Sequence, residues 1–460
     1  MNKLLYILSL SLFICFKAVA QKSLSLEEAQ AFAVENAYSN LIAQKEIDKS
    51  RSLVKETFAI GLPQINASGS FQHFLDIPVN VLPDFISPSV YGVLINEDLI
   101  PAGNVPEFGT VPAQFGTDYN VTGGVELQQL LFNGSYLIGL QATKAFVEVT
   151  QNQLEMNEAE IRQAVATAYY GVLVSGENER ILQENLNSLA KLLEDSQAFY
   201  EEGFIEEQEV EQLQLTVSQI NATLSNLKRQ STNLLDLLKM QMGMPLSENI
   251  VLSDNLDGLL NKYKSLTLAQ RTLETQAHPL YKTALSNVTL NGLNVKNQKA
   301  QYWPVLSAFA SHSQTAQRLE FDFFDSDGEW FPSTLWGLNL NVPIFSSGMK
   351  KNVVKQAQLD YDIANVQLLQ AEEGIKMEYN NAYSNFIFSQ EQLQIAKDNA
   401  DLAKRIYNKT QIKYQEGIAS SFELNQLQSQ YLEQEANYIE AVLNFLNAKS
   451  ALDKATNKYD

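Results

Sequence analysis

The sequence predicts an α+β protein made of two copies of one structural unit, in which very long antiparallel coiled-coil helices are combined with a few β-strands. A glycine-centred break occurs twice, at Gly203 and at Gly417, 214 residues apart. A seven-residue hydrophobic repeat follows each glycine, with the 3.5-residue period of supercoiled helices. Two pairs of segments alternate apolar and polar residues, as strands do. The fixed offset indicates an internal duplication.

Residues 1–20 are typical of a secretory signal peptide. Lys3 supplies the positive end, residues 4–16 form the apolar run, and residues 18–20 are the small residues of a cleavage site. The alternative is a membrane anchor, which the run favours less because it is shorter than a helix that spans a bilayer. The single cysteine, Cys15, lies inside it. We therefore expect an exported mature chain that needs no disulfide framework.

Charge and composition exclude several functions. The formal net charge of −20 argues against nucleic acid as a partner. His73, His278 and His312 are isolated, and no nucleophile motif or phosphate-binding glycine loop accompanies them. We therefore expect no catalytic, cofactor or metal site, and no enzyme. No apolar run of bilayer length follows residue 20, so a mature chain that crosses a membrane must do so as strands of a closed barrel.

The first repeat is expected over residues 21–245. Ser25 and Glu28 have the spacing of a capping box, and Gly61 and Pro63 end the first helix. Proline and glycine then become frequent between two alternating segments, which indicates a long irregular loop with room for short strands. The expected elements are a helix over 24–60, a strand over 64–74, a loop over 75–118, a strand over 119–132, and long helices over 135–202 and 207–242.

A polar linker at the equator of the unit is expected over residues 246–266, and the second repeat over 267–460. The Phe132–Gly134 junction between strand and helix has a counterpart at Phe345–Gly348, with one residue added. From that junction on, the offset between the copies is a steady 214. The expected elements are strands over 304–314 and 334–345 and long helices over 349–415 and 421–457.

The strands have one apolar and one polar face. A buried face that carries Glu126 and Gln128 would be costly, whereas a face that lines water would not. Four strands are too few for a barrel, since single-chain bacterial barrels start at about eight strands. An open sheet edge in lipid would leave backbone groups unsatisfied. Protomers must therefore pool their strands, and two chains would give eight and three would give twelve.

Both glycine breaks are similar to the pattern Tyr-x-x-Gly-x-x-Ser-x-x-(Asp/Glu)-(Val/Leu), which is typical of a known family. The second break matches it fully, and the first has Glu206 in place of the serine. With residues 24–29 and both strand-to-helix junctions, these breaks make the chain resemble the TolC-like outer-membrane efflux proteins, also called outer membrane factors. The second break carries Tyr414, Gly417, Ser420, Glu423 and Leu424; the first carries Tyr200, Gly203, Glu209 and Val210.

The resemblance implies a homotrimer, with a 12-stranded β-barrel in the lipid of the outer membrane and a periplasmic α-barrel. It implies a passive exit duct of a tripartite efflux or type I export system. An inner-membrane pump of the RND or ABC type would supply the energy, through a periplasmic adaptor (membrane fusion) protein. Drugs, metal ions and secreted proteins are all compatible cargoes. The alternative is a periplasmic coiled-coil scaffold without a pore, which would not need strands with a polar face.

The resemblance also implies roles for the two breaks, which form the periplasmic tips of the helical hairpins. Adaptor docking is expected at both tips. Acidic side chains shortly after the second glycine line the narrow entrance in this family, and a threefold ring of carboxylates favours cations. The simpler alternatives are helix caps and solvated helix ends. The docking residues are Tyr200, Gly203, Phe204, Tyr414, Gly417, Ile418 and Ser420, and the gate residues are Glu209, Gln212, Glu423 and Gln426.

Two features depart from the family pattern. Gln212 and Gln426 stand where a second acid is found, so the ring would carry half the charge. The basic residue that some members place just after the second tip glycine is absent, because Ile418 and Ala419 stand there. Any latch that closes the entrance must therefore differ.

Overall fold

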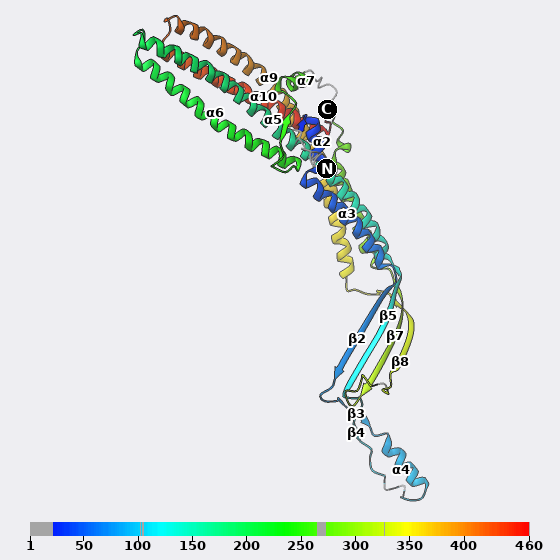
Figure 1. The fold of residues 1–460 in the computed structure, drawn as a ribbon. Helices are drawn as coiled ribbons and strands as arrows, with labels where there is room; N and C mark the ends of the chain where they lie inside the picture. Colours follow the sequence, from blue (N-terminus) through cyan, green and yellow to red (C-terminus); the bar gives the residue numbers. More distant parts are fainter. Residues whose placement is uncertain (1–21, 102, 104, 265–272, 326, 460) are drawn as a thin grey trace, which may run out of the picture. The chain divides into compact units, whose positions relative to one another are not determined.

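The computed structural model describes residues 22–101, 103, 105–264, 273–325 and 327–459 (Figure 1). The predicted signal peptide and the end of the expected linker, residues 265–266, lie outside these residues. The chain divides into two units. The helical unit consists of Met1–Ser52, Lys144–Gly292 and Gln358–Asp460, and the sheet unit of Leu53–Thr143 and Leu293–Ala357.

The sheet unit contains a four-stranded antiparallel sheet in the order β2-β5-β7-β8 (Figure 1). Its two central strands come from different repeats and pair from Tyr119–Arg318 to Asn133–Val305, with an irregularity between Leu130 and Phe132. The strands are β2 (Gln64–His73), β5 (Tyr119–Asn133), β7 (Val305–Arg318) and β8 (Phe331–Asn341).

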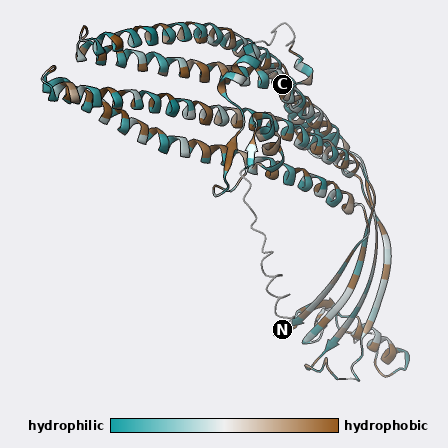
Figure 2. Cartoon of the chain, turned by 45° about the horizontal axis from the view of Figure 1, so that its top comes forward, coloured by the Kyte–Doolittle hydropathy of each residue, from teal (hydrophilic) through white to brown (hydrophobic). Residues whose placement is uncertain are grey.

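The register gives the sheet one mainly apolar and one mainly polar face. Residues directly opposite each other in neighbouring strands lie on the same face. One apolar row consists of Ile65, Leu127, Ala310 and Trp336, and one polar row of Ser68, Gly124, Ser313 and Ser333. Glu126 lies on the polar face and accepts a hydrogen bond from Gln128 Nε2 at 2.8 Å. Figure 2 shows that these strands carry both hydrophilic and hydrophobic residues.

The segment between β2 and β5 is more regular than predicted. It holds a hairpin of two short strands, β3 (Val79–Pro83) and β4 (Thr110–Gln114), for which the predicted loop over 75–118 left room, and also a helix, α4 (Ile86–Asn96), which was not predicted. Asp84 Oδ1 accepts the backbone N–H groups of Ile86 and Ser87 at the start of α4. The prolines inside these elements are compatible with them, since Pro88 lies in the first turn of α4, and Pro83 and Pro112 lie on strands that have only one neighbour.

The helix predicted over 24–60 is broken into α2 (Leu26–Asn36) and α3 (Tyr38–Ile60). Ala37 between them has an extended ψ of 136°. The end of α6 lies against this point. A Cβ on Gly243 would come within 2.2 Å of the Asn36 carbonyl oxygen. The capping box does form, since Glu28 N donates to Ser25 Oγ at 3.3 Å and Ser25 N donates to Glu28 Oε2 at 2.8 Å.

Four long helices dominate the helical unit, although the first parts of two of them belong to the sheet unit. Hydrophobic residues of all four pack in one cluster near the tips, which includes Leu189, Leu213, Tyr407 and Leu424. In this cluster the rings of Tyr407 and Tyr431 stack, with centroids 5.4 Å apart. The four helices are α5 (Gly134–Glu201), α6 (Glu207–Met242), α9 (Met349–Gln415) and α10 (Ser421–Thr456).

The expected polar linker contains ordered elements. The strand β6 (Ile250–Leu252) pairs in parallel with β1 (Lys22–Leu24), and α7 (Leu256–Lys264) follows. The buried Tyr169 hydroxyl on α5 lies 2.9 Å from the Leu24 carbonyl oxygen and 2.8 Å from Asp254 Oδ2. Burial raises the pKa of Tyr169, and its bond to Asp254 raises it further. The start of the described chain is therefore held against the middle of α5.

The first described elements of the second repeat are η3 (Thr275–Ala277) and α8 (Pro279–Ala300). Within the described ranges, no helix combines the length and the apolar character that a membrane span requires.

Candidate functional site at the helical tips

Both tip glycines end their helices in the same way. Gly203 and Gly417 have φ values of +79° and +71°, which lie in the left-handed region that glycine adopts without steric cost. The Gly203 N–H donates to the Tyr200 carbonyl and the Phe204 N–H to the Phe199 carbonyl, both at 2.9 Å. This is the Schellman pattern, and the corresponding bonds form around Gly417. In each copy of Tyr-x-x-Gly, the glycine therefore ends the helix, and its N–H bonds to the carbonyl of the tyrosine.

The tips expose large apolar side chains. Phe204 and Ile418, which follow the two glycines, are each 75% exposed, and Phe422 is 69% exposed. The Phe199 ring meets Phe204 edge to face, with centroids 6.5 Å apart. Tyr200 is also partly exposed, whereas Tyr414 is buried. The tips thus present apolar groups that nothing within the described chain covers.

The helices that leave the tips start differently. Ser420 is the N-cap of α10, and its Oγ accepts the Glu423 N–H at 3.2 Å. Glu206 is the N-cap of α6 and forms no such bond. The departure of the first tip from the family pattern therefore removes one capping hydrogen bond.

Side chains of the two repeats meet at the tips. The hydroxyl of Tyr414 lies 3.2 Å from Ser196 Oγ. Burial raises the pKa of Tyr414, and the nearby Glu209 carboxylate also raises it. Ser421 Oγ donates to Gln212 Oε1 at 3.1 Å. Two of the four predicted gate residues, Glu209 and Gln212, are therefore half-buried and face the second repeat within one protomer.

The other two predicted gate residues lie in different surroundings. Glu423 and Gln426 on α10 are exposed, and their side chains bond to no other described residue. The duplicated sequence positions are thus not equivalent in space. Only the pair from the second repeat is free to face solvent or another chain.

Sequence reasoning missed polar contacts inside the helical cluster. Gln428 Nε2 donates to Asn185 Oδ1 at 2.8 Å, and both side chains are buried. Gln411 Nε2 donates to Ser188 Oγ at 3.2 Å. These pairs link α5 to α9 and α10, so they fix which faces of the two hairpins meet. Among the described residues, no group of His, Cys, Asp and Glu side chains could hold a metal ion.

The profile of a family described as "Outer membrane efflux protein" matches residues 107–243 and 269–458, which is most of the chain. The chain belongs to this family. Membership confirms the predicted resemblance and the prediction of an efflux channel in the outer membrane, and it does not favour the scaffold alternative. The family is one of channels rather than enzymes. No curated protein sequence matches the chain.

Solved structures show the same fold. The CmeC outer membrane channel of Campylobacter jejuni is 17% identical with a TM-score of 0.68, and the match covers 94% of this chain and 85% of CmeC. VceC of Vibrio cholerae is 14% identical with a TM-score of 0.65, over 94% and 96% of the two chains. The open state of the MtrE outer membrane channel of Neisseria gonorrhoeae is 15% identical with a TM-score of 0.65, over 94% and 89%. These matches confirm the predicted fold class.

Proposed function

We propose that three copies of this protein form one passive export duct, which an inner-membrane pump drives through a periplasmic adaptor. The observation that carries the proposal is a four-stranded sheet with one polar face and two free outer edges. In the described sheet, β2 and β8 each have one neighbour, and they run antiparallel to each other. The β8 edge of one copy can therefore pair with β2 of the next, which satisfies backbone groups that lipid would leave unpaired.

The tips are the proposed docking sites for the adaptor. Phe204 and Ile418 occupy matching positions after the two glycines, and both are exposed. Exposed apolar groups that cluster on a rigid support are typical of protein interfaces. The Schellman turns supply that support, since each turn is closed by two backbone hydrogen bonds.

The proposed entrance is a ring formed by Glu423 and Gln426 from three copies. The support is the difference between the repeats, because Glu209 and Gln212 face Tyr414 and Ser421 inside the protomer. The exposed pair on α10 is left to line the opening. Three carboxylates in a narrow opening favour cations.

Planar-bilayer recordings of the purified, detergent-solubilised trimer test this proposal. Glu423→Ala is expected to lower the preference for cations over anions, because it removes the three carboxylates of the ring. Glu416→Ala removes an exposed carboxylate that precedes the tip glycine and serves as the matched control, with no expected change. Unaltered conductance and ion selectivity in Glu423→Ala would refute the assignment of Glu423 to the entrance. A chain that runs as a monomer and never conducts would refute the duct itself.

A further inference from the structure

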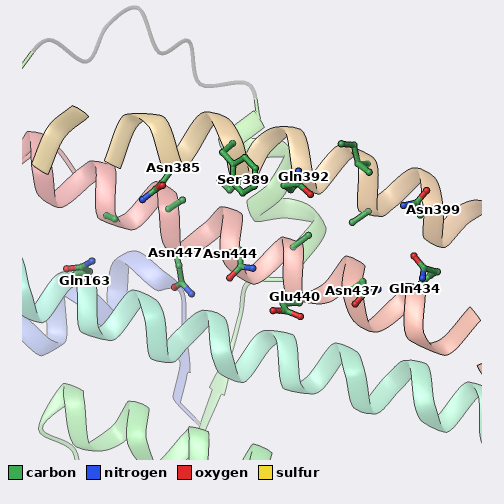
Figure 3. A pocket seen from close by; sticks show the side chains of 16 residues that line it. Gln163, Asn385, Ser389, Gln392, Asn399, Gln434, Asn437, Glu440, Asn444 and Asn447 are labelled. Atoms are coloured by element: carbon green, nitrogen blue, oxygen red, sulfur yellow. The ribbon is translucent and has the colours of Figure 1, made fainter. Parts of the chain in front are cut away.

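A groove with an unusual lining runs between α9 and α10 in the helical unit (Figure 3). Its volume is about 810 Å³, within the range of sites for small organic molecules. Carboxamide side chains dominate its walls, and several of them recur seven residues apart. Among its amides are Asn385, Gln392 and Asn399 of α9, and Asn437, Asn444 and Asn447 of α10.

These amides have no side-chain hydrogen-bond partners among the described residues. None of the six forms a side-chain hydrogen bond with another described residue, although amides elsewhere in the helical unit do, as Gln428 and Asn185 show. The Oδ1 atom of Asn447 is buried and still accepts no hydrogen bond. A buried polar atom without a partner costs about 1–3 kcal/mol. The groove therefore presents unused hydrogen-bonding capacity to whatever enters it.

One wall of the groove continues the proposed entrance. From Glu423 to Asn447, polar residues of α10 follow each other at alternating spacings of three and four, and all are exposed or half-exposed. In a supercoiled helix this spacing keeps residues on one face. The stripe consists of Glu423, Gln426, Gln430, Glu433, Asn437, Glu440, Asn444 and Asn447. If Glu423 lines the entrance, as proposed above, the groove opens into the same passage.

The chemistry of the lining selects among solutes. An amide offers two donors and an acceptor, which suits hydroxyl groups that both donate and accept. Phe388 and Ile395, which are 59% and 52% exposed, add an apolar wall against which the C–H face of a ring can pack. Of the described side chains that line the groove, Glu440 alone is charged, so nothing there attracts an anion.

We propose that this groove is a weak binding site for uncharged, hydroxyl-rich solutes of the carbohydrate type as they pass through the channel. The inference rests on the proposed duct, and it adds a class of cargo to it. Weak binding at the wall concentrates a solute in the passage and still lets it leave, as conduction through a pore requires.

The test uses the purified trimer in planar bilayers, with maltohexaose as the probe. We expect maltohexaose to interrupt the ion current in a saturable way. A polyethylene glycol of the same hydrodynamic size has ether acceptors but almost no donors, so it reports exclusion of volume alone and should block less. Spermine, which is cationic and lacks hydroxyls, reports attraction by the carboxylates of the stripe. Equal block by maltohexaose and the glycol, or block by spermine alone, would overturn the inference.

Variants place the binding in the groove. The double substitution Gln392→Leu and Asn444→Leu is expected to weaken the maltohexaose block about tenfold or more, since two amide hydrogen bonds are lost. Gln394→Leu is the matched control, because Gln394 is an exposed amide on α9 that bonds to Asp398 outside the groove. An unchanged block in the double variant, or loss of its trimer because a neighbouring copy fills the groove, would overturn the inference. Absence of any conductance in the native protein would instead refute the duct.

Discussion

Three glycines with nearly the same backbone conformation allow a controlled test of what positions the helical hairpins. Gly203, Gly243 and Gly417 have φ values of +79°, +72° and +71°. An alanine in this region costs about 1–2 kcal/mol at each position. At the two tips nothing lies within 4 Å of an added Cβ, so no further cost is expected.

The third glycine has different surroundings. A Cβ on Gly243 would lie 2.2 Å from the Asn36 carbonyl oxygen and 3.0 Å from the Ala37 Cα. Both are backbone atoms, which cannot move aside as the end of a flexible side chain can. Overpacking of this kind adds about 1–3 kcal/mol, so Gly243→Ala should cost about 2–5 kcal/mol in total.

Urea unfolding of the three alanine variants, followed by far-UV circular dichroism, measures these costs. Gly203→Ala and Gly417→Ala serve as controls for the backbone conformation, since they change φ preference without a clash. The reasoning fails if Gly243→Ala is no less stable than either tip variant. In that case the backbones at Gly243 and at Asn36 would not be packed as closely as the structure shows.

Two further predictions concern the tips and the cluster behind them. Ser420→Ala should lower the free energy of unfolding by about 1 kcal/mol, because α10 loses its cap. Glu206→Ser should supply the missing cap to α6 and raise the free energy of unfolding by a similar amount. Changes of the opposite sign in urea titrations would contradict the capping assignment. Burial raises the pKa of Tyr407 to about 12. The unfolded chain, with a tyrosine pKa of about 10, loses its proton first as the pH rises, so this contribution is fully present below pH 10 and is lost between about pH 10 and 12. Tyr407→Phe should show a smaller loss of stability in that range, and an identical pH profile would refute the role of burial.

Much of the fold could be predicted because the pattern is long and occurs twice. The heptad spacing extends over dozens of residues, and alternation in the strands marks both faces of the sheet. Each tip turn depends on a glycine that adopts a positive φ, which is a local property of the sequence. The tips could therefore be located from Tyr-x-x-Gly alone. These features need no knowledge of distant contacts.

Features that depend on distant contacts could not be predicted. Nothing in the sequence around Ala37 marks a break, and the backbone that lies against Asn36 and Ala37 is that of Gly243, at the far end of another helix. The helix α4 was missed because Pro88 and its neighbours are typical of loops, although a proline in the first turn is compatible with a helix.

Only part of the candidate site could be predicted from the sequence. The tip residues follow from the motif, and the duplication assigns the same role to Glu209 and Glu423. Packing of one hairpin against the other separates them, since Glu209 lies near the buried Tyr414 whereas Glu423 is exposed. A repeat in the sequence cannot specify which copy faces inward.

The free outer edges of β2 and β8 also link folding to protein concentration. A sheet that ends in two unpaired backbone ladders reaches its full hydrogen bonding only when other copies arrive, so assembly contributes to the stability of each subunit by mass action. Dilution should then lower the denaturant concentration at which the sheet unfolds. A newly exported chain that has not yet assembled exposes its strand edges, which can pair with strands of unrelated chains.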